Sequence, residues 1–218
     1  MPQEKSATSR IVILIGLVLA LVVPLFGLSR SAEHLPGIPP LLGREGFWWA
    51  LIALVLLYAL IVERKPLSSI GLRRPTWKTF AFGIGTAVFT LLAVGLTIQF
   101  IFSALHLTQN QEALKQIAGL PLWYKVLLVT RAAVGEELLF RGYGIERIEE
   151  LTGSKLLAGL VTLVLFTFGH LSYWGAAQLI VAGLAGLVLT ILYLWRRDLG
   201  ANIVAHWVID GVGIFFAH

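Results

Sequence analysis

Residues 136–141 read EELLFR, which places two adjacent carboxylates and an arginine in a stretch that is otherwise almost wholly apolar. Glu137 and Arg141 lie four residues apart, so on a helix they share one face, with the carboxylate N-terminal to the cation, the favourable orientation. Glu136 points about 100° away around the helix and lacks that partner. We therefore predict that Glu137 and Arg141 form an anchoring ion pair and that Glu136 is a general base.

Two later apolar stretches carry histidines. In FTFGH, Phe166 and His170 lie four residues apart, and in NIVAHWVID the same spacing joins Asn202, His206 and Asp210. Polar side chains stacked on one face of an apolar helix are costly to expose to lipid, so we expect these faces to point inward. Phe166 is expected to pack rather than to take part in chemistry.

The spacing around the GSK turn near Gly153 predicts that the separate motifs meet. Glu136 lies 17 residues before Gly153 and His170 lies 17 residues after it, so two antiparallel helices would bring both side chains to one level. His206 follows the turn at residues 196–198 by about seven residues, or about 10 Å. We expect the three groups to converge in the cytoplasmic half of a bilayer.

The composition indicates a membrane protein. Of 218 residues, 57% are hydrophobic and 13% are charged, and the mean hydropathy is +0.84. A soluble domain with this balance could not cover its surface with polar groups. Cysteine is absent, which excludes disulfides and thiolate metal sites. The net charge of +5 comes from basic residues in short loops between apolar stretches, so we expect no nucleic-acid partner.

The expected fold is all-α, a polytopic transmembrane helical bundle with about seven spans, because backbone groups inside lipid must satisfy one another. The predicted spans are residues 11–28, 47–62, 79–104, 122–145, 156–171, 174–195 and 199–217. The second and fifth of these spans are short and could extend into their flanks. The first is too long for a signal peptide and is interpreted as a retained span. Residues 1–120 are expected to support a catalytic core at 121–218, whose last four spans carry the site.

Charge asymmetry predicts the orientation. With the N-terminus in the cytoplasm, twelve Lys and Arg residues fall on the cytoplasmic side and four on the other, which satisfies the positive-inside rule. We therefore expect a multi-pass protein of the cell membrane with its C-terminus outside. The basic connector at 63–78 is expected to contact anionic heads of the lipid bilayer.

The three motifs together resemble a known family. EExxxR on one span, FxxxH on the next and HxxxD/N on a later one are similar to the CPBP family, named for CAAX proteases and bacteriocin-processing enzymes and also called the Abi family. The resemblance covers about residues 121–215. It implies an intramembrane endopeptidase of the CAAX-protease type, acting on peptide or protein substrates in or at the membrane.

By this resemblance, Glu136 corresponds to the glutamate that activates water and His170 to its partner, while Glu137 and Arg141 complete the first motif. His206 and the residue at position 210 correspond to the pair that stabilises the oxyanion. The prenyl proteases usually have asparagine where this chain has Asp210. Asp210 could orient His206 as a carboxylate, or it could be protonated and donate a hydrogen bond itself.

Other interpretations remain open. Glu136, His170 and His206 could bind zinc as a carboxylate and two imidazoles. HExxH is absent, however, and the glutamate and histidine mechanism needs no metal, so we expect no cofactor. Inward-facing carboxylates and histidines also suit a proton relay in a transporter, and a catalytically idle scaffold of the same fold is a third possibility. Arg131 and Gln178 are assigned no role.

Overall fold

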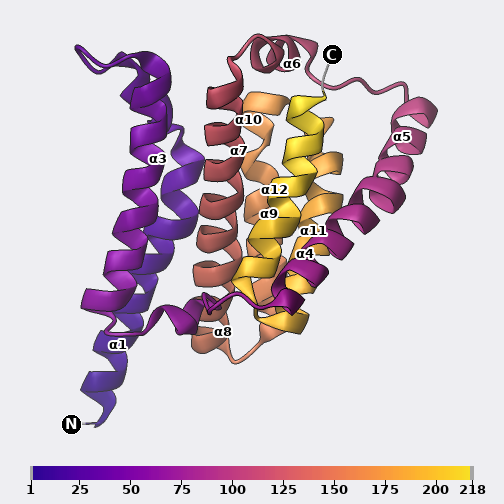
Figure 1. The fold of residues 1–218 in the computed structure, drawn as a ribbon. Coiled ribbons are helices and arrows are strands. Elements are labelled where there is room, and N and C mark those ends of the chain that lie inside the picture. The colour runs from indigo at the N-terminus through magenta and orange to yellow at the C-terminus, as the bar shows by residue number, and fades with distance from the viewer. Residues whose placement is uncertain (1, 217–218) are drawn as a thin grey trace.

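The computed structural model describes residues 2–216, with side chains from residue 9 onward, and this part of the chain is all-helical (Figure 1). Residues 217–218, which end the last predicted span, lie outside the described residues. The elements, with η for a 3-10 or π-helical segment, are α1 (Pro2–Leu17), η1 (Val18–Val22), η2 (Val23–Phe26), α2 (Leu28–Ser31), η3 (Ala32–His34), α3 (Pro40–Leu57), η4 (Tyr58–Val62), η5 (Leu67–Ile70), α4 (Trp77–Phe89), η6 (Thr90–Val94), α5 (Gly95–Ala104), α6 (Gln111–Ala118), α7 (Leu122–Glu136), η7 (Glu137–Ile145), α8 (Glu146–Thr152), α9 (Lys155–Gly169), α10 (Leu171–Trp174), α11 (Gln178–Arg196) and α12 (Leu199–Phe215).

Within the described residues, five helical stretches are long and apolar enough to cross a membrane, against about seven predicted. They are Ser9–Phe26, Pro40–Val62, Trp77–Ala104, Lys155–Trp174 and Gln178–Arg196. The helix Leu199–Phe215 is apolar but shorter. The continuous helical path from α7 into η7 carries five charged residues between 122 and 145, which lowers its mean hydropathy. The protein is therefore a multi-pass membrane protein with an all-helical fold.

The second span begins earlier than predicted. Helix α3 starts at Pro40, not at residue 47, and so includes Arg44 and Glu45. Proline suits the first turn of a helix because the amide hydrogen it lacks would have no partner there. Glu45 is only 3% exposed, so its charge lies inside the bundle instead of marking the end of the span.

Helix α7 runs through the middle of the bundle, with α1 and α3 on one side and α9, α11 and α12 on the other (Figure 1). Helix α1 packs closely against η7, the continuation of α7. A Cβ on Gly16 of α1 would lie 1.8 Å from the hydroxyl oxygen of Tyr143 in η7, so only glycine fits there. Helix α4 packs along α12, whereas α5 leans away and has no buried residue.

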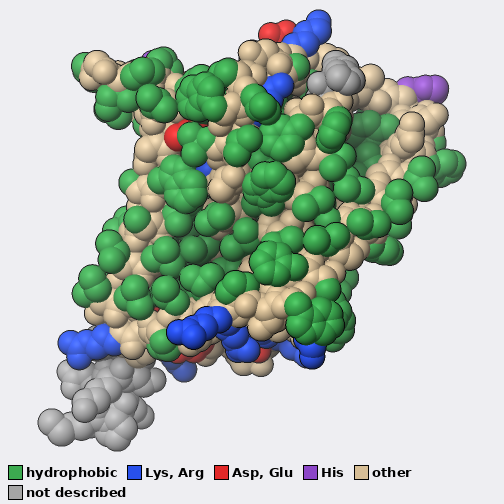
Figure 2. Space-filling model, in the orientation of Figure 1, with side chains coloured by type: hydrophobic (Ala, Val, Ile, Leu, Met, Phe, Trp, Pro, Cys, Tyr) green, Lys and Arg blue, Asp and Glu red, His purple; other side chains and the backbone are tan. Residues whose placement is uncertain are grey.

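One end of the bundle carries several ion pairs, of which one is fully buried. Arg147 lies 2.8 Å from Glu63, and both side chains are at most 2% exposed. Nearby, Arg197 pairs with Glu146 at 2.7 Å and with Glu149. Burial alone would lower the pKa of Arg197, but these two carboxylates raise it above its ordinary value. Lys and Arg side chains gather along this end, beneath a broad apolar surface (Figure 2).

Candidate active site

At the junction of α7 and η7, two neighbouring carboxylates point in different directions and contact different partners. Helix α7 ends at Glu136, and the π-helical segment η7 begins at Glu137. Wider π-helical turns occur frequently at functional sites because they change the direction in which successive side chains point. The side chain of Glu137 is fully buried, whereas that of Glu136 is 20% exposed.

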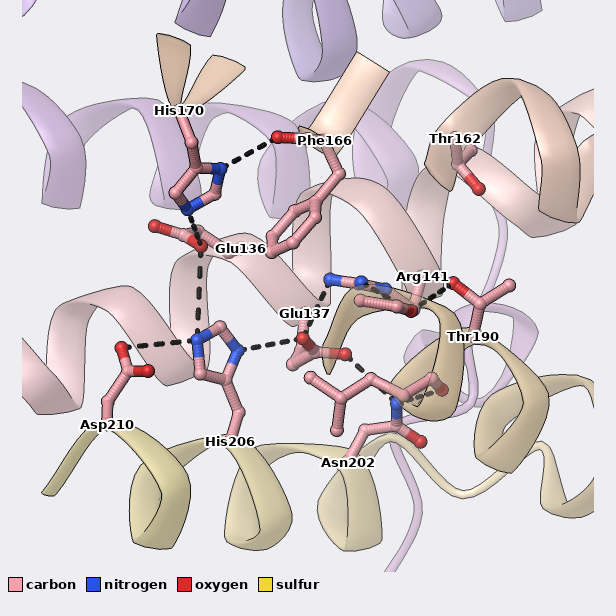
Figure 3. A network of polar contacts seen from close by, with 12 residues as sticks. Glu136, Glu137, Arg141, Thr162, Phe166, His170, Thr190, Asn202, His206 and Asp210 are labelled. Atoms are coloured by element: carbon pink, nitrogen blue, oxygen red, sulfur yellow. Dashed lines mark hydrogen bonds and ion pairs between the residues drawn. The ribbon is translucent and has the colours of Figure 1, made fainter. Parts of the chain in front are cut away.

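Glu137 is the centre of a hydrogen-bond network (Figure 3). Its Oε1 accepts a bond from Arg141 Nη1 at 2.8 Å, which confirms the predicted pair. The same oxygen accepts a bond from His206 Nδ1 at 2.8 Å, and Oε2 accepts one from Asn202 Nδ2 at 3.0 Å. Glu137 therefore fixes two side chains of α12 as well as Arg141, a wider role than the sequence predicted.

The predicted convergence of Glu136, His170 and His206 is confirmed. Glu136 Oε2 lies 3.9 Å from His170 Nε2 and 4.0 Å from His206 Nε2. The ring of His170 is held from the other side, where Nδ1 lies 2.8 Å from the carbonyl oxygen of Phe166. A carbonyl can only accept, so Nδ1 carries the hydrogen and Nε2, the nitrogen that faces Glu136, is free to accept when the ring is neutral.

His206 lies between two carboxylates. Its Nδ1 donates to Glu137, and its Nε2 lies 3.3 Å from Asp210 Oδ2. The ring is thus oriented from behind by Glu137, while Asp210 lies at the nitrogen that faces Glu136. The side chain of His206 is 6% exposed and that of Asp210 is 32% exposed, so the site is buried on the Glu137 side and partly exposed on the Asp210 side.

Phe166 packs against the same groups. Its ring lies 4.0 Å from Arg141 Cζ, with its centroid 4.7 Å from that of His170. A Cβ on Gly186 of α11 would lie 3.0 Å from this ring and 3.2 Å from Arg141 Nη2. Close helix packing at Gly186 keeps Phe166 and the guanidinium in place.

Two charged residues of the site were not assigned a role from the sequence. Glu136 does not pair with Arg141, as expected, but Arg131 Nη1 lies 3.9 Å from its Oε1 and gives it a partner that the sequence did not predict. Arg131 Nε in turn lies 3.4 Å from Oε2 of Glu45 on α3. An arginine inside a span is itself a functional signal that could have indicated Arg131. Glu45 gave no such signal because it was placed before the second span.

A family model described as type II CAAX prenyl endopeptidase Rce1-like matches residues 118–212. This segment, 95 of the 218 residues, is similar to the CPBP family. This agrees with the resemblance of the three motifs, and it supports a relationship of this segment to CAAX-type proteases. No curated protein and no solved structure was found to match the chain.

The CPBP match includes both glutamates of the EExxxR motif, His170, His206 and Asp210, but it excludes α3. A tetrahedral zinc ion with ligands at about 2.0–2.1 Å needs ligand atoms about 3.3–3.4 Å apart. Glu136 Oε2 lies farther than this from both imidazole nitrogens, and among the described residues no group of three or more His, Cys, Asp or Glu is placed to hold a metal ion. The arrangement fits a metal poorly, and we derive no step through one.

Proposed function

We propose that this protein belongs to the CPBP family and is an intramembrane endopeptidase in which Glu136 and His170 activate a water molecule. The observation that carries the proposal is the separation of 3.9 Å between Glu136 Oε2 and His170 Nε2. That distance is too long for a direct hydrogen bond. It suits two acceptors that bind one water, each at about 2.8 Å. The hydrogen bond at Nδ1 fixes the His170 ring from behind, which favours a defined position for the nucleophile.

In the proposed reaction, the water gives one proton to Glu136 while its oxygen attacks the carbonyl carbon of the peptide bond. His170 Nε2 accepts the other hydrogen of the water and holds its orientation. The resulting carboxylic acid of Glu136 then delivers its proton to the leaving nitrogen as the carbon–nitrogen bond breaks. No covalent intermediate with the protein is needed.

We propose that His206 stabilises the oxyanion through Nε2–H. The buried carboxylate of Glu137 on Nδ1 favours the protonated imidazole and fixes its direction. Removing one such donor typically costs about 3–4 kcal/mol of transition-state stabilisation. Asp210 accepts from the same Nε2–H before substrate binds, at the observed separation of 3.3 Å.

The proposed substrates are peptides or proteins in or at the membrane, and the basic end of the bundle is proposed to face the cytoplasm, with the C-terminus outside. What supports this orientation is the gathering of Lys and Arg side chains at that end (Figure 2). Residues 1–120 are proposed as the supporting half and residues 121–218 as the catalytic half.

The test is cleavage of a quenched peptide library by purified protein in detergent. Glu136→Gln should abolish cleavage, whereas Glu112→Gln, at an exposed carboxylate on α6, should leave it unchanged. Proton flux into liposomes without cleavage would support a transporter instead. A protein with neither activity would be a scaffold. Substrates retained by the Glu136→Gln variant can be identified by mass spectrometry.

A further inference from the structure

Arg131 lies between two carboxylates that belong to different halves of the chain. Its side chain is 10% exposed, with Nε 3.4 Å from Glu45 Oε2 and Nη1 3.9 Å from Glu136 Oε1. The guanidinium carbon also lies 5.3 Å from the ring centroid of Trp48, a second residue of α3. Helix α3 therefore holds the cation that stands next to the proposed general base.

Glu45 is itself fixed in place. Its Oε1 accepts a hydrogen bond from the Tyr124 hydroxyl at 3.2 Å, and that hydroxyl accepts one from Arg44 Nη2 at 3.2 Å. Glu45 and Tyr124 are almost fully buried. A chain of contacts thus runs from Arg44 to Arg131 and ends at Glu136.

The two oxygens of Glu136 face different groups. Oε1 lies toward Arg131, while Oε2 lies toward His170 and His206. Among the described residues, Glu136 accepts no side-chain hydrogen bond, in contrast to Glu137, so its direction depends on these three charged or polar neighbours. Arg131 is the one that cannot lose its proton.

We propose that Arg131, held by Glu45 and Trp48 of α3, is a positioning residue that directs Oε2 of Glu136 toward the two imidazoles. The inference rests on the proposed function of Glu136 as the general base. It places part of the active site in the N-terminal half, outside the segment that matches the family. Because Glu45 balances the charge of Arg131, the pair adds no net charge to the site.

The decisive experiment compares Arg131→Met with the double variant Arg131→Met/Glu45→Gln. The single variant leaves the Glu45 charge buried without its cation and should unfold more easily. The double variant removes both charges and should recover its thermal stability. Its kcat should still fall by about 10–100-fold, because a small displacement of a reacting group is enough to cause such a loss. KM should stay within about twofold, since substrate binding is unchanged.

A purely structural role for Arg131 predicts the opposite, namely that the double variant recovers kcat together with stability. Arg131→Lys should retain more of the activity than Arg131→Met, because an ammonium keeps the positive charge. The retention should be incomplete, because lysine lacks the planar guanidinium that reaches two carboxylates. The matched control is Arg147→Met/Glu63→Gln, a buried pair of the same type that also joins the two halves but lies away from the site. Its kcat should equal that of the wild type in detergent at a temperature where it is folded.

The outcomes separate this inference from the proposed function. If the wild type cleaves peptides and Glu136→Gln does not, the proposed function stands. A folded Arg131→Met/Glu45→Gln variant with wild-type kcat would then overturn the positioning role alone. If the wild type cleaves nothing under any condition, both fall together.

Discussion

Variants of Glu137 can separate its contribution to stability from its contribution to catalysis. Its carboxylate is fully buried, and it accepts hydrogen bonds from Arg141, His206 and Asn202. Glu137→Gln keeps the size of the side chain but removes its charge. Arg141, 1% exposed, then has no anionic partner; its remaining neighbours are the neutral amide, the carbonyl oxygen of Gly186 at 3.1 Å and an aromatic ring.

Breaking a buried ion pair on one side costs about 3–5 kcal/mol, because the remaining charge stays in a low-dielectric environment. We therefore expect Glu137→Gln to lower the free energy of unfolding by about that amount. Glu137→Gln/Arg141→Met removes both charges, and such replacements are often neutral. The double variant should therefore regain most of the lost stability.

Catalysis should not return with stability. In the double variant His206 loses the buried carboxylate that holds Nδ1 and directs Nε2–H, so kcat should remain lower by about 10²–10³, the usual cost of losing one oxyanion donor. The free energy of unfolding is measured by chemical denaturation in mixed micelles, and kcat is measured with one quenched peptide. Two results would refute the reasoning: a Glu137→Gln protein within about 1 kcal/mol of wild type, or a folded double variant with full activity.

Three further outcomes are expected. Asp210→Asn should keep substantial cleavage activity while Asp210→Ala does not, because an amide can still bond His206; equal losses in a kcat assay would contradict this role. Gly186→Ala should lower the free energy of unfolding by about 1–3 kcal/mol through overpacking against Phe166 and Arg141, measured in the same micelles. Gly183→Ala is its control, because a Cβ there would lie 3.6 Å from Thr167, an ordinary contact, so the two variants should differ clearly. A zinc chelator should leave cleavage intact, and inhibition that zinc specifically reverses would show this expectation to be wrong.

Local periodicity was enough to predict part of the site. The Glu137–Arg141 pair follows from a spacing of four residues on one helix, and that contact survives in the π-helical segment at 2.8 Å. The meeting of Glu136 with His170 follows from equal distances to a shared turn, which fixes the level of two antiparallel neighbours. Both predictions depend on short stretches of chain, where helix geometry leaves few alternatives.

Contacts between distant spans could not be predicted in the same way. The pairing of Glu45 with Arg131 joins residues 86 positions apart on helices whose relative rotation no local pattern specifies. The same applies to the bond between His206 Nδ1 and Glu137, which gives the ring a second carboxylate besides Asp210. The start of α3 was misplaced for a related reason, since charges at 44 and 45 look like the end of a span unless their buried partners are known.

The charges of the whole site constrain how it can work. Four carboxylates and two guanidinium groups gather within ion-pair distance of one another or of the two imidazoles: Glu45, Glu136, Glu137, Asp210, Arg131 and Arg141. The two guanidinium groups balance two of the four negative charges. Because each buried charge must be paired or neutralised, the other two must be balanced by protons on the imidazoles or on the carboxylates themselves. His206, with a carboxylate at each nitrogen, is the natural place for one of these protons. A site balanced in this way can pass the proton of water to Glu136 and on to the leaving nitrogen without creating an unpaired charge.

Asp210→Asn removes one negative charge from that balance while leaving a hydrogen-bond acceptor in place. Retention of activity in that variant would mean that the acceptor at His206 Nε2, and not the fourth negative charge, is what the reaction requires.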